Sequence, residues 1–400
     1  MLQGLVRQDA RNVHQTMILD ADRLANELSD HILRNLAPNS EKVLRPFSSA
    51  EAAELLGVSM TNLRKLHHDG KIPEVAASGT GRKLYTAQGL LEIRHALAAQ
   101  ARNPLAYLPG RRAGERMHVI CAITFKGGSG KSTSTVHLAQ RFALKGYRVL
   151  VVDMDPQASL STLMGLRPEI DLYERGTIYD VLRYDADRIG IEKVIRPSHF
   201  PSLDLCPGGL ILSEYETETP TALRQGDPEP FYTRLRSALN TVDDRYDLVF
   251  VDCPPQLGFL TLTAMTAATS LVVPVIPNMI DVASLAQFMT MASSALSQIA
   301  NAGGEFDYDF MRYLLCRYEP TDGPQTQVSA FLRNMFPGRV MTSPFLKSTA
   351  IADAGLTSDT IYEIDRAQVN RATLNRALES INLVSAELER DLHKAWGRAV

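Results

Sequence analysis

Several features that would place a protein in a special class are missing from this sequence of 400 residues. Only four cysteines are present, they lie far apart, and no two of them form a CxxC pair. Neither a disulfide framework nor a zinc site is therefore expected. No apolar stretch approaches the roughly 18 residues that a membrane span needs, and the N-terminus lacks the apolar segment of a signal peptide. We expect a cytoplasmic protein.

A strong net charge is missing too. The sequence has 42 Lys and Arg against 45 Asp and Glu, a formal net charge of −3, so any contact with nucleic acid must be local. The charge is uneven, because residues 1–116 contain 16 basic and 12 acidic residues (+4) and the remainder contains 26 and 33 (−7). The N-terminal part is therefore the part expected to meet polyanions.

From residue 117 onward, short apolar runs alternate with helical patterns. Near-continuous apolar runs separated by helices are typical of parallel strands that are buried on both faces. The chain is also longer than one hydrophobic core usually organises. We therefore expect residues 117–400 to form an α/β domain with a doubly wound, mainly parallel sheet. The expected strands are 118–124, 148–153, 248–252, 271–276 and 312–316, and the last long helix is 365–396.

Residues 1–45 contain one predicted helix, over 17–36. Its apolar residues recur at helical spacing and form a stripe opposite a charged face. Such a helix either docks on its own domain or pairs two subunits. The sequence leaves both possibilities open.

Residues 46–100 are predicted to form a compact helical module. Ser48 and Glu51 have the spacing of a capping box, Gly57 is expected to end the first helix, and Ser59 to cap the second. Two short helices joined by a tight glycine turn are typical of a helix-turn-helix, and residues 79–85 resemble a wing. The side chains expected to contact DNA are Thr61, Asn62, Arg64 and Lys65 on the second helix and Arg82 and Lys83 on the wing.

A helical hairpin that only packs is the alternative for this module. Residues 101–116 hold two prolines and two glycines without any periodicity. This composition predicts a solvated linker, which would separate a winged helix-turn-helix module from the α/β domain.

The most informative stretch is the loop from Lys126 to Thr133, which follows an apolar run and opens a helical pattern. Its glycines let backbone N–H groups turn toward phosphate oxygens without Cβ clashes, and the helix N-terminus adds partial positive charge. Lys131 would reach the β- and γ-phosphates, and the Ser132 hydroxyl would bind Mg²⁺. ATP or ADP with Mg²⁺ is the expected ligand. The nucleotide-binding set is Lys126, Gly127, Gly128, Ser129, Gly130, Lys131, Ser132 and Thr133.

Two of the apolar runs end in acidic residues. Asp252 ends the run 248–252, and a carboxylate there can hold a Mg²⁺-bound water. Asp153 ends another run and is followed two residues later by Asp155. Because doubly wound sheets bind ligands at the carboxyl ends of their strands, these acids are expected at the nucleotide site.

The loop departs from the standard phosphate-binding pattern, because Phe125 stands where the first glycine is expected and Lys126 follows it. The sequence KGGSGKS resembles the deviant Walker A motif, KGGxGK[ST], of the ParA/MinD class of ATPases. This resemblance implies that Lys126 crosses a dimer interface to the partner's phosphates. It also implies that Asp155, in the DxDPQ motif, orients or deprotonates the attacking water. The candidate catalytic residues are thus Lys126, Lys131 and Asp155, and the candidate metal-site residues are Ser132, Asp153 and Asp252.

A helix-turn-helix ahead of a deviant Walker ATPase is the layout of the larger, type Ia ParA plasmid-partition ATPases, and it resembles RepA of RepABC operons in particular. The resemblance implies a slow ATPase that forms a homodimer on ATP and binds non-specific DNA of the nucleoid. A ParB-like (RepB) centromere-binding partner would stimulate hydrolysis, and operator DNA bound by the module would repress the protein's own operon. The candidates for the non-specific DNA contacts are Arg317, Lys347, Arg371 and Arg376.

Two other functions share parts of this pattern. A MinD-like membrane-positioning ATPase has the same nucleotide motifs, but it needs a basic amphipathic terminal helix, and the last helix here is rich in acids. A transcriptional regulator that uses ATP only as a structural effector is the other alternative. Residues 198–235 give no indication of function.

Overall fold

The computed structural model describes residues 13–35, 42–75, 83–124, 126–167, 171, 176–366 and 369–399. The chain divides into two compact units, Met1–Lys42 and Val43–Val400. Helix α1, Val13–Asn35, belongs to the first unit and confirms the helix predicted over 17–36. Apolar side chains along it are exposed within its unit, among them Met17 at 66% and Leu24 at 64%. A pairing role for this helix stays a prediction.

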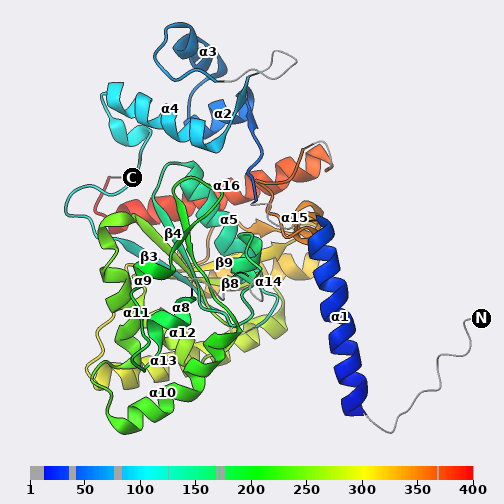
Figure 1. Ribbon diagram of the computed structural model, residues 1–400. Coiled ribbons are helices and arrows are strands. Elements are labelled where there is room, and N and C mark those ends of the chain that lie inside the picture. Colours follow the sequence, from blue (N-terminus) through cyan, green and yellow to red (C-terminus); the bar gives the residue numbers. More distant parts are fainter. Residues whose placement is uncertain are drawn as a thin grey trace, which may run out of the picture. The chain divides into compact units, whose positions relative to one another are not determined.

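The second unit contains a sheet of eight strands in the order β10-β9-β8-β3-β7-β4-β6-β5. Figure 1 labels β3, β4, β8 and β9 of this sheet. Its strand pairs are parallel except for the antiparallel pair of β5 and β6. The mainly parallel sheet that the sequence predicts is therefore confirmed. The strands are β3 (His118–Ala122), β4 (Val149–Asp153), β5 (Arg196–Pro197), β6 (Leu203–Cys206), β7 (Leu248–Asp252), β8 (Ser270–Val275), β9 (Phe310–Tyr318) and β10 (Phe345–Leu346).

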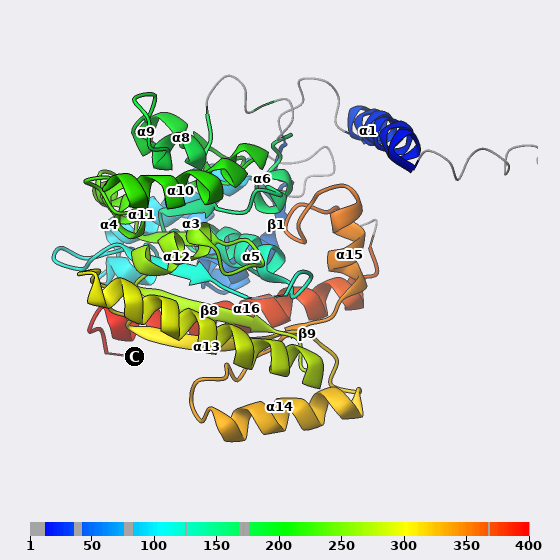
Figure 2. The same cartoon turned by 90° about the horizontal axis from the view of Figure 1, so that it is seen from below.

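Helices cover both faces of this sheet (Figure 2). Val149 and Val151 of β4 join the core that includes α5 (Lys131–Leu144) and α16 (Arg371–Ala395). Leu150 and Val152 join the core on the other face. This alternation is what buries the central strands completely. The remaining helices of the α/β part are α6 (Ser159–Leu163), α8 (Ile178–Leu182), α9 (Ile191–Val194), α10 (Ser213–Gln225), α11 (Phe231–Asn240), α12 (Phe259–Ala267), α13 (Met279–Asn301), α14 (Gly323–Met335) and α15 (Thr349–Leu356), with short 3₁₀ helices at Pro104–Ala106, Leu210–Leu212 and Asp243–Arg245.

The segment 46–100 contains the helices that its capping residues predict. Ser48 and Glu51 form the capping box of α2 (Ser49–Leu56), and Gly57 ends that helix with a φ of 69°. The Ser59 side chain caps α3 (Met60–His68), and Thr86 caps α4 (Ala87–Gln100). The strand β1 (Phe47–Ser48) pairs antiparallel with β2 (Leu84–Tyr85). Of the predicted wing 79–85, residues 79–82 lie outside the described part of the chain.

A buried arginine joins this segment to the α/β part. Arg94 on α4 is 4% exposed and donates hydrogen bonds to the carbonyls of Leu55, Tyr107 and Leu144. Burial lowers the pKa of Arg94 to about 10. Because its partners are three carbonyl oxygens from three different segments, Arg94 fixes α4 against α2 and against the end of α5.

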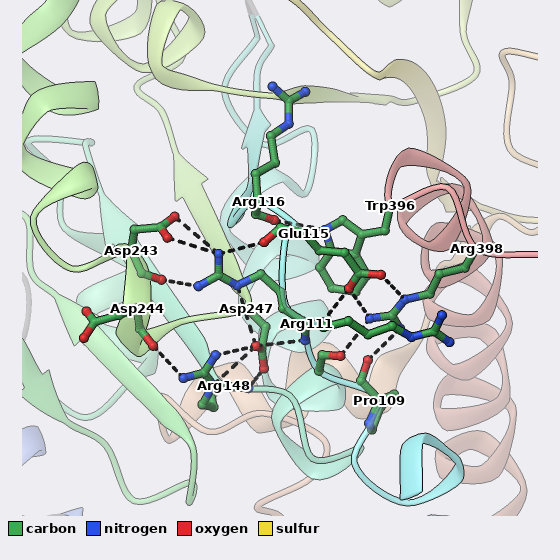
Figure 3. Close-up of polar contacts among 12 residues, drawn as sticks. Pro109, Arg111, Glu115, Arg116, Arg148, Asp243, Asp244, Asp247, Trp396 and Arg398 are labelled. Carbon is green, nitrogen blue, oxygen red and sulfur yellow. Dashed lines mark hydrogen bonds and ion pairs between the residues drawn. The ribbon is translucent and has the colours of Figure 1, made fainter. Parts of the chain in front are cut away.

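The predicted solvated linker is only partly correct, because its second half is held by a network of charged residues (Figure 3). The buried Asp247 carboxylate accepts hydrogen bonds from the backbone N–H of Arg111 at 3.1 Å and of Arg148 at 2.8 Å. Arg398, near the C-terminus, donates to Glu115 and to the carbonyls of Pro109 and Gly110. The composition of this segment resembles a linker, but its polar groups have fixed partners far along the chain.

One expectation about apolar stretches is wrong. Among the described residues, α13 is long and apolar enough to cross a membrane by length and composition. Leu285, Phe288 and Ala292 of this helix are buried in the core on one face of the sheet. That packing makes α13 a part of the α/β fold, and length and composition alone are weak indications of a membrane span.

The Asp247 network predicts a large stability effect. We expect Asp247→Ala to lower the free energy of unfolding by about 2–4 kcal/mol, because two backbone N–H groups and the guanidinium of Arg148 lose their buried acceptor. Urea denaturation followed by circular dichroism measures this change. Asp244→Ala is the matched control, because only the backbone carbonyl of Asp244 contacts Arg148, and its effect should stay within about 0.5 kcal/mol. Equal effects of the two substitutions would contradict this account of the segment.

Candidate nucleotide-binding site

The loop that joins β3 to α5 has the backbone of a phosphate cradle. Gly128 and Gly130 have φ values of 75° and 89°, in the left-handed region that favours glycine. A Cβ added at Gly127 or Gly128 would meet no atom of the described residues within 4 Å. The space around these two glycines is therefore open, as close approach of a phosphate requires. Helix α5 begins at Lys131, so its first N–H groups lack intrahelical acceptors.

A cleft of about 540 Å³ contains the predicted nucleotide-binding residues. All eight residues from Lys126 to Thr133, Ser132 among them, line this cleft together with Asp155. Its volume lies in the range that small-molecule ligands occupy. The other lining residues come from the loop after β4, from α6, from the segment after β7 and from the end of α15: Gln157, Ser159, Thr162, Leu163, Pro255, Gly355 and Ser358.

Lys131 and Asp252 form a buried ion pair beneath the loop. The Lys131 Nζ lies 2.7 Å from Asp252 Oδ1, and the two side chains are 6% and 0% exposed. Burial acts to lower the pKa of Lys131, but the charge of Asp252 and its hydrogen bond outweigh this effect and raise it. Lys131 is therefore positively charged at neutral pH, as phosphate binding requires.

The same pair shows that the residues fit a magnesium ion. The second carboxylate oxygen of Asp252, Oδ2, is buried and has no hydrogen-bond partner among the described residues. A buried charged oxygen without a partner is costly, and a metal-bound water would supply one. Asp252 and Ser132 thus offer the hard oxygen ligands that Mg²⁺ prefers.

Asp153 and Asp155 follow one another closely but lie in different surroundings. Asp153 is fully buried and its Oδ2 accepts hydrogen bonds from the Ser161 N–H at 2.8 Å and hydroxyl at 2.7 Å. Burial and the neighbouring charge of Asp252 raise the pKa of Asp153 to about 7. Asp155 lines the cleft instead, and burial is the main cause of its raised pKa. Asp155 is the carboxylate that faces the ligand space, and a metal role for Asp153 stays a prediction.

Lys126 is held by an acidic residue of its own chain. Its Nζ forms an ion pair with Asp281 in the first turn of α13, and the Lys126 side chain is 46% exposed whereas that of Asp281 is 5% exposed. The other carboxylate oxygen of Asp281 is buried and has no hydrogen-bond partner in the part of the chain that the structure describes. Asp281 could not be predicted from the sequence, because no local motif marks it. Its contact with Lys126 depends on how α13 packs beside the phosphate loop.

Gly208 is a second residue of the site that sequence reasoning missed. It follows β6, inside the stretch that gave no indication of function. A Cβ at this position would lie 2.7 Å from the carbonyl oxygen of Asp153 and 2.9 Å from that of Asp155, so only glycine allows the approach. The Gly208 N–H also donates to the Ser161 hydroxyl at 3.1 Å. The sequence Pro207-Gly208-Gly209 directly after an apolar run could have indicated a close backbone approach at the end of this strand.

The residues predicted to contact DNA fall into separate groups. Thr61, Asn62, Arg64 and Lys65 are all exposed on α3, Lys83 is exposed beside β2, and Arg82 lies outside the described residues. A pocket of about 400 Å³ brings Arg64 and Lys83 together with His67 and His68. Lys347 pairs with Glu319 at 3.1 Å, and Arg371 and Arg376 are exposed on α16. Arg317 contacts the phosphate loop, because its Nη1 donates to the Gly128 carbonyl.

Comparison with known proteins agrees with this geometry. A family model described as an AAA domain matches residues 117–302. The "Putative replication protein A" of Sinorhizobium fredii (strain NBRC 101917 / NGR234) is 46% identical over 394 residues, which covers 96% of this chain and 96% of the relative. The "Chromosome partitioning protein ParA" of Myxococcus xanthus (strain DK1622) is 36% identical over 174 residues, 43% of this chain and 57% of the relative. The chain belongs to the ParA-type partition ATPases.

The fold of this ParA-type protein also resembles that of solved structures. A structure named "Partition Protein" superposes with a TM-score of 0.57 at 16% identity, over 93% of this chain and 99% of that chain. At this identity the likeness concerns the fold alone. It agrees with a P-loop NTPase whose sheet is mainly parallel.

The site predicts that Lys131 contributes most of the phosphate affinity within one subunit. We expect Lys131→Ala to weaken binding of a fluorescent ATP analogue at least about tenfold, because a charged hydrogen bond to phosphate contributes roughly 1.5–3 kcal/mol. Arg141→Ala is the matched control, since Arg141 lies on the same helix and outside the cleft. Unchanged affinity of the Lys131 variant would show that the cleft is not the nucleotide site.

Proposed function

We propose that this ParA-type protein is an ATPase that dimerises on ATP and moves plasmid DNA during segregation. The proposal depends on one observation, the placement of Lys126 at the edge of the cleft that Lys131 and Asp155 line. A subunit that has one lysine inside its phosphate loop does not need a second lysine there for binding. A second, half-exposed lysine can instead reach the phosphates of a second subunit.

The residues of the cleft support slow hydrolysis within one subunit. Asp155 would accept the proton of the attacking water or orient that water, and its raised pKa brings it closer to the range of a useful base. Lys131 would stabilise charge on the β- and γ-phosphates. Ser132 and Asp252 would hold Mg²⁺, whose charge would offset that of the phosphates. One subunit alone lacks a further cation to stabilise the charge of the γ-phosphate during hydrolysis. Lys126 of a partner subunit would supply that cation.

The surface beside Lys126 supports a dimer at this place. Met279 and Ile280 precede Asp281 and are 59% and 74% exposed. Leu356, next to the cleft-lining Gly355, is 74% exposed. Large apolar side chains around the mouth of a polar cleft are typical of surfaces that another protein covers. A second copy of the chain would cover them when the cleft holds ATP.

Dimerisation would connect ATP to DNA segregation. We propose that the ATP dimer binds non-specific DNA of the nucleoid, and that a ParB-like partner at the plasmid centromere stimulates hydrolysis and release. Arg371 and Arg376, exposed on α16, are candidate contacts, and Lys347 is another. Such binding would weaken steeply with salt, because each neutralised phosphate releases counterions. The site of action would be the cytoplasm.

We propose a second DNA-binding role for the segment 46–100, as a winged helix-turn-helix that binds operator DNA and represses the protein's own operon. The exposed polar residues of α3 support this assignment, since Asn62 and Arg64 carry groups that recognise base edges. The alternative of a regulator that uses ATP only as a structural effector does not account for Asp155 in the cleft. A MinD-like membrane role is disfavoured, because the apolar side of α16 is buried in the core.

The first test concerns Lys126. We expect Lys126→Ala to keep ATP binding in the monomer and to lose dimerisation with a non-hydrolysable ATP analogue, because the trans contact to phosphate is removed. Sedimentation velocity with the analogue, with ADP and without nucleotide measures both states. A variant that still dimerises as wild type does would rule out the trans role.

The second test concerns operator binding. We expect Arg64→Ala to weaken binding of the operator DNA by about 1–3 kcal/mol and to leave ATP turnover unchanged, because Arg64 lies on α3, away from the cleft. Electrophoretic mobility shift on the promoter fragment of the operon measures the affinity. Arg102→Ala, an exposed arginine outside the helices of the segment, is the control. A parallel loss of turnover and DNA binding would contradict the separation of the two activities.

A further inference from the structure

The carboxyl end of β9 lies against the phosphate loop, although β8 separates β9 from β3 in the sheet. A Cβ added at Gly130 would lie 3.5 Å from Cys316 Cβ, so the last turn of the loop rests on this strand. The next residue, Arg317, donates from its Nη1 to the carbonyl oxygen of Gly128 at 3.3 Å. Two successive residues of β9 therefore contact two glycines of the loop.

The backbone of Arg317 is strained. Its φ is 51°, in the left-handed region that a residue with a Cβ occupies at a cost of about 1–2 kcal/mol. Strain of this kind is usually retained where it serves a function. Glycine would adopt the same backbone without strain. The arginine side chain is thus the part of this residue that needs a physical role.

The sequence predicted that Arg317 contacts non-specific DNA, and its side chain is exposed. The contact with Gly128 gives it a different role. Arg317 is not one of the residues that line the cleft, so it reaches the Gly128 carbonyl from outside the cleft lining. In a trans peptide the C=O and the following N–H point in opposite directions. The N–H of Ser129 therefore points away from Arg317, and Ser129 itself lines the cleft.

We propose that Arg317 is a positioning residue of the phosphate loop, which holds the Gly128–Ser129 peptide in the orientation that presents the Ser129 N–H to a phosphate. This inference depends on the proposed nucleotide site. Gly128, which has no Cβ and a left-handed φ of 75°, gives the loop the freedom to turn this peptide over. A hydrogen bond from outside the cleft removes that freedom before the ligand arrives, which is pre-organisation.

The test uses a substitution that separates affinity from stability. We expect Arg317→Gly to raise the Kd for a fluorescent ATP analogue by about two- to tenfold, the range of one hydrogen bond. Its unfolding midpoint should be equal to or higher than that of wild type, because glycine relieves the strained φ. Arg317→Asn should show the same loss of affinity, since asparagine tolerates the left-handed backbone but has no guanidinium.

The control removes a similar bond elsewhere. Arg333 also donates to a backbone carbonyl, that of Thr342, at a site outside the cleft, so Arg333→Ala should leave the Kd unchanged. Wild-type affinity in the Arg317→Gly variant would overturn the inference, with or without a change in salt-dependent DNA binding. The inference would also be overturned if both Arg317 variants lost affinity and both also had a lower unfolding midpoint than wild type, because general destabilisation would then explain the loss. Absence of ATP binding in wild type would instead reject the nucleotide site itself.

Discussion

The structure depends on the ion pair between Lys131 and Asp252, which lies in an interior where neither side chain is more than 6% exposed. Moving both charges out of water is costly, and their attraction offsets that cost only when their remaining groups are also bound. One oxygen of Asp252 has no such partner within the described ranges of the chain. The pair therefore joins the phosphate loop to a neighbouring strand and at the same time leaves the site electrostatically incomplete. A triphosphate with its metal ion would complete it.

The register of the sheet explains how residues far apart in the sequence reach this pair. Ala122 of β3 and Asp153 of β4 both lie opposite Asp252 of β7. Because these strands are parallel, their carboxyl ends lie at one edge, and the loops that follow β3, β4 and β7 all open there. The same register places two carboxylates side by side. It raises the pKa of the buried Asp153, while Asp155, two residues later, faces the cleft.

Residues whose role depends on a local pattern could be predicted from the sequence. The loop from Lys126 to Thr133, the capping box of Ser48 and the strand that ends at Asp252 each depend on neighbours a few positions away. Asp281, Gly208 and Arg317 could not be assigned their contacts. These contacts form only when α13 and β9 dock beside the phosphate loop and when β6 pairs with β4. The segment around Arg111 was predicted to be solvated for the same reason, since its partner Asp247 lies 136 residues away.

The central claim, that Lys126 contacts the phosphates of a second subunit, can be tested directly. Lys126 cannot contact those phosphates and Asp281 at the same time. In this structure it pairs with Asp281 of its own chain. The most direct measurement is a structure of the protein with a non-hydrolysable ATP analogue and Mg²⁺. Our account predicts two subunits, with Lys126 of each on the phosphates bound by the other and released from Asp281. A single loaded subunit with Lys126 still paired to Asp281 would contradict it.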